Sequence, residues 1–140
     1  MPDATAERHS AAVMTSGRLS VTGADLYYET EGTGPAVVLL HGFALDTRMW
    51  DSQVAALRDV ATVVRLDMRG FGRSSVPDIG VPYSRTDDVV SLLDHLGIVS
   101  ATIVGLSMGG EVATQMALKV PERVRDLVLL DALLNHVPWD

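Results

Sequence analysis

The stretch Val104-Gly105-Leu106-Ser107-Met108-Gly109-Gly110 decides the fold of this chain. An apolar, β-branched run over 102–104 enters it and predicts a short buried strand, and a helical pattern over 110–120 leaves it. The Gly-x-Ser-x-Gly motif needs this setting, because a sharp strand-to-helix turn holds the serine in a strained backbone with its hydroxyl projecting. Strand and helix then pass so closely that the positions of Gly105 and Gly109 must be small. Ser107 is therefore the candidate nucleophile.

A loop after another strand complements this turn. His41-Gly42-Phe43 follows the continuous apolar run 36–40, which predicts a strand buried on both faces. We expect the N–H groups of Phe43 and Met108 to form an oxyanion hole, since a loop amide and the amide after the nucleophile are the usual donors in this arrangement. His41 ends a different strand from the one before Ser107, so we expect it to fix the loop rather than to act as a base.

The rest of the sequence alternates strands with helices. The pattern predicts a hairpin of strands 18–21 and 26–31, buried strands at 36–40, 61–66, 102–104 and 124–130, and helices at 48–58, 86–96 and 110–120. This alternation indicates an α/β fold, with a mostly parallel sheet and helices on both of its faces. Chemistry in such sheets lies beyond the carboxyl ends of the strands, where the sequence places His41, Asp67, Ser107 and Asp131.

The composition narrows the possible partners and cofactors. The 140 residues are 47% apolar, enough for the core of one domain, and the formal charge of −7 argues against nucleic acid and anionic membranes. The chain has no cysteine, which excludes disulfides and thiolate zinc sites, and no metal-ligand cluster stands out.

Residues 1–17 predict a disordered tail without the features of a secretory signal. No apolar run approaches the roughly 18 residues that span a membrane, so we expect a cytoplasmic protein.

The order of several motifs resembles that of the α/β-hydrolase superfamily over about residues 18–135. The motifs are His41-Gly42-Phe43, Trp50, Asp67–Ser74, Gly105–Gly110, Pro121–Val124 and Leu127–Asp131. The resemblance is to the branch of small esterases, enol-lactonases, perhydrolase-like enzymes and carbon–carbon bond hydrolases. It implies strand order 1-2-4-3-5-6 and a serine hydrolase that cleaves a small carboxylic ester or lactone through an acyl-enzyme, with no cofactor. Dehalogenase-like and epoxide-hydrolase-like members carry Asp at the nucleophile position, and Ser107 argues against both chemistries.

The same resemblance implies that parts of the domain are missing. The family's acid usually follows the seventh strand and its histidine the eighth, whereas this sequence ends soon after the sixth. We therefore expect residues 18–140 to be the N-terminal part of an α/β-hydrolase domain, without the cap, the last strands and the final helix. Asp131 is a candidate acid, although it could instead cap the strand end. His136 is a candidate base, but no evident element holds its imidazole in place.

Two alternative functions follow. A serine without a histidine base is a poor nucleophile, so the chain could be a truncated or split gene product that is inactive alone or works only with a complementary fragment. The apolar edge of the sixth strand would then serve self-association or the binding of that fragment. The other alternative is carbon–carbon bond hydrolysis or peracid formation on the same scaffold.

A dinucleotide-binding loop at Gly70-x-Gly72 is disfavoured, because the stretch runs into Pro77 and Pro82 instead of a helix.

Overall fold

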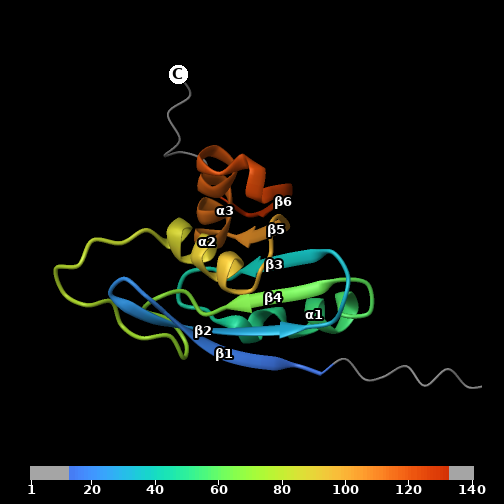
Figure 1. Cartoon of the computed structure of the whole chain (residues 1–140), viewed down its shortest axis with the longest axis horizontal. Coiled ribbons are helices and arrows are strands. Elements are labelled where there is room, and N and C mark those ends of the chain that lie inside the picture. The colour runs from blue at the N-terminus through green and yellow to red at the C-terminus, as the bar shows by residue number, and fades with distance from the viewer. Residues whose placement is uncertain (1–12, 133–140) are drawn as a thin grey trace, which may run out of the picture.

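A single sheet of six strands organises residues 13–132, the part of the chain that the computed structural model describes (Figure 1). The strands are β1 (Thr15–Val21), β2 (Ala24–Glu31), β3 (Ala36–Leu40), β4 (Thr62–Leu66), β5 (Ala101–Leu106) and β6 (Val124–Leu130). Their order in the sheet is β1-β2-β4-β3-β5-β6. The β1–β2 and β2–β4 pairs are antiparallel, and the other three pairs are parallel. The predicted α/β class and strand order are confirmed.

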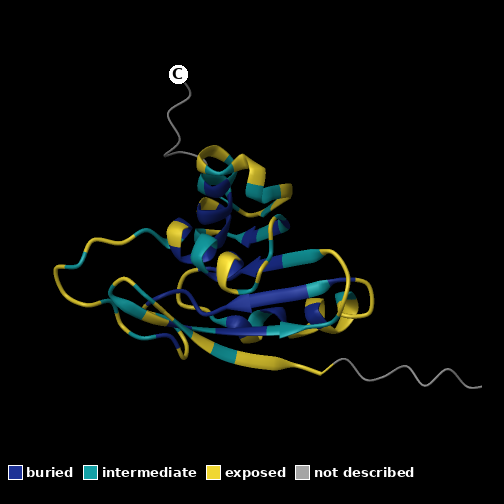
Figure 2. Cartoon of the chain, viewed as in Figure 1, coloured by how far each residue is buried: buried dark blue, intermediate teal, exposed yellow. Residues whose placement is uncertain are grey.

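Helices cover both faces of this sheet. They are α1 (Asp51–Leu57), α2 (Arg85–His95) and α3 (Met108–Lys119), with 3-10 turns η1 (Thr47–Trp50) and η2 (Pro121–Arg123). Successive residues of a strand point to opposite faces. Accordingly, Val38 and Leu40 pack in the larger core under α2 and α3, while Leu39 packs in a smaller core with Trp50 and Val54. Figure 2 shows the central strands as the most deeply buried part of the molecule.

The first strand begins earlier than the sequence suggests. β1 starts at Thr15, so residues 15–17, assigned above to a disordered tail, belong to the hairpin. Gly17 lies opposite Tyr28 in the register, and a Cβ at Gly17 would stand 2.5 Å from the Tyr28 hydroxyl. The lack of a side chain at Gly17 leaves room for the Tyr28 ring. Residues 1–12 lie outside the described range.

The helix predicted over 48–58 is divided into two elements. A 3-10 turn covers Thr47–Trp50 and leads into α1, which begins at Asp51. The Asp46 carboxylate accepts a hydrogen bond of 2.9 Å from the Arg48 N–H and thereby caps the first element. Across both elements Trp50 and Val54 are buried, as their spacing predicts.

β6 differs from the other parallel strands in its exposure. The sequence predicts a buried strand, yet Leu127, Val128 and Leu130 remain 38–41% exposed. β6 pairs only with β5 among the described strands, and α3 is the helix that packs against it. These three side chains are therefore only partly covered by residues 13–132, whereas Val124 and Leu129 pack against the larger core. No helix in that range is long and apolar enough to cross a membrane.

Candidate active site

Ser107 occupies a strained turn between β5 and α3. Its backbone has φ 51° and ψ −113°, a left-handed conformation that side-chain-bearing residues rarely adopt. The turn is fixed from both sides, because the Ser107 N–H donates to the Leu130 carbonyl at 3.0 Å and its own carbonyl accepts from the Glu111 N–H at 3.0 Å. The residue is exposed, and its hydroxyl makes no hydrogen bond to any residue in 13–132. The structure thus presents the hydroxyl at the carboxyl end of a central strand.

Glycines make this close turn possible. A Cβ on Gly105 would collide with the backbone of Gly109 and stand 2.6 Å from the Gly110 nitrogen. A Cβ on Gly109 would stand 2.6 Å from the carbonyl carbon of Leu40 in β3. Real Cβ atoms essentially never approach other atoms so closely. The motif's two glycines are therefore required by space on the strand side and on the helix side of Ser107.

His41 is a structural residue of the neighbouring loop. Its imidazole is completely buried, with Nδ1 2.8 Å from the Gly42 carbonyl and Nε2 2.9 Å from the Met68 nitrogen. Because the Met68 N–H can only donate, Nε2 accepts and Nδ1 carries the proton that it donates to Gly42. Burial lowers the pKa of His41 below its ordinary value, which keeps the ring neutral. Both nitrogens are occupied, so the imidazole is not available to Ser107.

Two backbone N–H groups near Ser107 have no hydrogen-bond partner in the described part of the chain. Neither the Phe43 N–H nor the Met108 N–H donates a hydrogen bond to any group in residues 13–132. The Phe43 side chain is 72% exposed, and its ring meets the Phe71 ring edge-on with centroids 5.4 Å apart. Gly42 accepts from the Leu45 N–H at 3.1 Å, and this bond closes the turn that carries Phe43.

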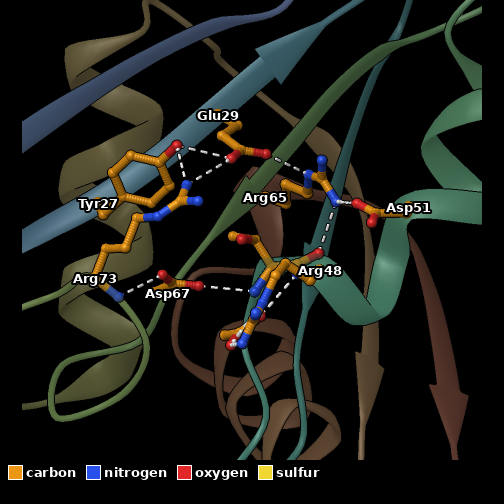
Figure 3. A network of polar contacts seen from close by, with 9 residues as sticks. Tyr27, Glu29, Arg48, Asp51, Arg65, Asp67 and Arg73 are labelled. Carbon is orange, nitrogen blue, oxygen red and sulfur yellow. Dashed lines mark hydrogen bonds and ion pairs between the residues drawn. The ribbon is translucent and has the colours of Figure 1, made fainter.

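Asp67 fixes the loop that follows β4. Its carboxylate accepts hydrogen bonds from the Thr47 N–H at 2.7 Å and from the Arg73 N–H at 2.8 Å, and so joins two loops (Figure 3). Next to it, Arg65 lies between Glu29 at 2.7 Å and Asp51 at 2.6 Å. All these carboxylates have partners. Both carboxylate oxygens of Asp67 are therefore engaged in joining the two loops.

Of the candidate acid and the candidate base, the structure describes only the acid, Asp131. Asp131 follows β6 directly, is exposed and has φ 46°. Its neighbours touch the serine turn, since Leu130 accepts from the Ser107 N–H and the Ala132 methyl packs where a side chain on Gly110 would lie. No hydrogen bond joins the Asp131 carboxylate to another residue in 13–132. His136 lies outside the described range.

The one other histidine of the described range has its hydrogen-bond partner away from the serine turn. His95 ends α2, and its Nε2 lies 3.2 Å from the Tyr28 hydroxyl. In residues 13–132, therefore, no histidine forms a hydrogen bond with Ser107. The same range holds no group of three or more His, Asp or Glu side chains arranged to bind a metal ion.

Arg85 is a residue of this region that the sequence analysis missed. It begins α2 and lines a pocket of about 340 Å³ together with Met108 and residues of α3. Its guanidinium lies over the Phe71 ring, which in turn contacts Phe43. A cation in the first turn of a helix opposes the helix dipole, and that mismatch was the available signal.

Residues 35–140 match the profile of the family described as "alpha/beta hydrolase fold". This chain belongs to that family. The match covers the serine turn, the His41 loop and β6.

Relatives of this α/β-hydrolase chain carry several activities in their names. A putative non-heme chloroperoxidase of Synechocystis is 38% identical over 84% of this chain and 44% of its own length. An epoxide hydrolase of Caballeronia sordidicola is 36% identical over 76% of this chain and 34% of its own length. The crystal structure of the enol-lactonase from Burkholderia xenovorans LB400 superposes with a TM-score of 0.73, at 36% identity, over 79% of this chain and 45% of its own length. The chain thus spans less than half the length of these three relatives.

Proposed function

We propose that Ser107 is the nucleophile of a hydrolase that cleaves small carboxylic esters or lactones through an acyl-enzyme. The observation that carries the proposal is the left-handed backbone of an exposed serine between a parallel strand and a helix. Strain of this kind costs of order 1–3 kcal/mol and persists where function requires it. An ordinary strand-to-helix connection would not need it.

In the proposed reaction the Ser107 oxygen attacks the acyl carbon while its proton passes to a general base. The carbonyl oxygen becomes an oxyanion, which the free N–H groups of Phe43 and Met108 would hold. Each such donor contributes about 3–4 kcal/mol of transition-state stabilisation. The bond to the leaving oxygen then breaks as the base returns the proton to it, which releases the alcohol. Water, deprotonated by the same base, attacks the acyl-enzyme, and the Ser107 oxygen leaves with that proton, which releases the acid and restores the serine. We assign the base to a residue outside 13–132, with His136 as the candidate in this sequence and Asp131 as the carboxylate that would orient it.

The identity of the nucleophile favours esters and lactones over epoxides and alkyl halides. A serine oxygen that opened an epoxide or displaced a halide would form an ether. An ether has no carbonyl carbon for water to attack, so the enzyme could not be regenerated. A carboxylate nucleophile avoids this by forming an ester. Ser107 therefore separates this chain's proposed chemistry from that named for the epoxide hydrolase relative.

A second candidate function is suggested by β6. Its three exposed apolar residues lie on a strand that pairs with only one neighbour in the described range. We propose that this edge binds further polypeptide, either a complementary fragment that supplies the base or a second copy of the chain. In that case the isolated chain would contribute the nucleophile and little turnover.

Acylation of the serine tests the first proposal. The chain is incubated with p-nitrophenyl acetate, and the site of any acetyl group is found by peptide mass spectrometry. We expect acetylation of Ser107 that is absent in Ser107→Ala and retained in Ser52→Ala, which removes an exposed serine on α1. An acetyl group on other residues only, or a yield that is unchanged in Ser107→Ala, would contradict the proposal.

A further inference from the structure

Arg85 is a cation near the serine turn to which the proposed reaction gives no role. Its guanidinium carbon lies 5.5 Å from the ring centroid of Tyr83 and 5.9 Å from that of Phe71. Its Nε is fully buried and has no hydrogen-bond partner among residues 13–132. In residues 13–132 its side chain forms no ion pair. The aromatic contacts leave the edge of the guanidinium, which carries its N–H donors, without an acceptor.

This arrangement is unfavourable for the free protein. The dipole of α2 disfavours a positive charge at its first residue, and a buried N–H without an acceptor costs further free energy. Two acids, Asp87 and Asp88, lie in the same first turn, yet neither pairs with Arg85. Asp88 is occupied by Arg69, with two hydrogen bonds of 2.7 Å. An acceptor from outside the described residues would relieve both costs.

The pocket that Arg85 lines borders Met108, the residue that follows Ser107. Met108, whose N–H is one of the two free amides, lines the same cavity of about 340 Å³. The Phe71 ring under Arg85 contacts the ring of Phe43, which carries the other free amide. An acyl group held by these amides would therefore have Arg85 as a neighbour.

Two other charged residues line this pocket. Lys119 ends α3, eleven residues after Met108, which corresponds to about 16 Å along a helix. Glu111 is exposed and lies one turn after the serine, with no ion pair to Arg85. Its charge opposes an anion, so any attraction next to Met108 comes from Arg85.

We propose that Arg85 binds a carboxylate of the substrate, so that the ester or lactone cleaved at Ser107 also carries an acid group. The inference rests on the proposed function for the position of the reacting carbonyl. A guanidinium presents its N–H groups in a planar fork that matches the two oxygens of a carboxylate. Because such charge-assisted bonds are about twice as strong as neutral ones, a substrate acid would gain affinity that a neutral ester would not.

A pair of matched probes tests this proposal without requiring turnover. Monomethyl glutarate carries one ester and one carboxylate, and dimethyl glutarate replaces that carboxylate by a second ester. Each is titrated into the full chain, and binding is followed by NMR through the Arg85 Nε–H and the Phe43 and Met108 amides. We expect the monoester to bind about tenfold more tightly than the diester and to shift the Arg85 signal.

Variants assign that preference to one side chain. Arg85→Gln should reduce the affinity for the monoester to that for the diester. Arg85→Lys, which keeps the charge but loses the fork, should retain part of the preference. Lys119→Gln removes a cation from the same pocket and should leave the preference intact. Equal binding of the two probes, binding of neither, or a preference that survives in a folded Arg85→Gln chain would each overturn the proposal.

The failure of this inference is separable from failure of the proposed function. Carboxylate binding does not require the nucleophile, so Ser107→Ala should keep the preference for the monoester. If acetylation of Ser107 fails while the preference depends on Arg85, the binding inference stands and the nucleophile assignment falls. If acetylation succeeds without a preference, the reverse holds.

Discussion

At the scale of single residues, Ser107 and the two glycines around it form one steric unit. The sequence identifies all three, because the motif requires small residues at both positions. It does not reveal which atoms impose the requirement. The structure adds that Gly105 faces the helix backbone and that Gly109 faces β3.

Substitution of Gly105 by alanine tests this steric unit. The added Cβ would collide with the Gly109 backbone, which cannot move without shifting α3. We expect a loss of about 1–3 kcal/mol in the free energy of unfolding, measured by urea denaturation. Gly42→Ala is the matched control, since its Cβ would lie at an ordinary 3.5 Å from the side chains of Leu45 and Leu106. Equal stability of the Gly105→Ala chain and the native chain would contradict this account of the turn.

His41 leads to a prediction about pH. Its pKa is lowered in the folded chain because the ring is buried, so the unfolded chain binds more protons as pH falls below the ordinary value of 6.5. Stability should therefore be highest above pH 6.5, decrease as pH falls below it, and level off for this group once the folded pKa is passed. Denaturation midpoints measured between pH 5 and pH 8 should show this dependence, and His41→Gln should lose it. His95→Gln, which removes an exposed imidazole, is the control. A dependence that is unchanged in His41→Gln would refute the assignment.

At the scale of elements, the sequence predicts which segments form strands and helices better than it predicts where an element begins and which neighbours cover it. Apolar periodicity locates β3, β4 and α2 because burial decides those segments. It misplaces the start of β1, where the fit of Gly17 against Tyr28 depends on a partner strand. It also predicts a buried β6, since an apolar run cannot show whether a neighbour is present to cover it.

The ion pair that ties α2 to the loop after β4 is another feature that sequence cannot show. Arg69 and Asp88 lie on different elements, and their side chains are 1% and 7% exposed. Asp88→Asn would leave the Arg69 charge buried and unpaired, so we expect a loss of about 3–5 kcal/mol in the free energy of unfolding. Glu31→Gln is the control, because its partner Arg58 is 45% exposed and such pairs contribute about 0–1 kcal/mol. Similar losses in the two variants would contradict the proposed importance of burial.

At the scale of the whole molecule, we expect the exposed edge of β6 to decide whether the chain associates in solution. Leu127, Val128 and Leu130 are exposed on a strand that pairs only with β5 in residues 13–132, and such an edge favours association. We expect the 140-residue chain to associate as its concentration rises, and Val128→Lys to keep it monomeric, as measured by analytical ultracentrifugation. Leu118→Lys, at a 59% exposed position on α3, should associate like the native chain. A native chain that stays monomeric at every concentration would refute this expectation.

Much of the candidate site follows from sequence because it is local. Ser107, Met108 and the two glycines lie within five consecutive residues, and the His41 loop follows a strand that periodicity detects. The role proposed for Arg85 cannot be predicted from the sequence in this way. Its role depends on the Phe71 and Tyr83 rings beneath it and on the loss of Asp88 to Arg69, and these are contacts between separate segments.

The central claim is that Ser107 is a poised nucleophile whose base lies outside residues 13–132. It is tested most directly by labelling the chain with a fluorophosphonate while imidazole is added as an external base. We predict a phosphonyl adduct on Ser107 that forms slowly alone, forms faster as imidazole is raised, and is absent in Ser107→Ala. The absence of a Ser107 adduct even at high imidazole, or equal labelling of Ser107→Ala, would contradict the claim.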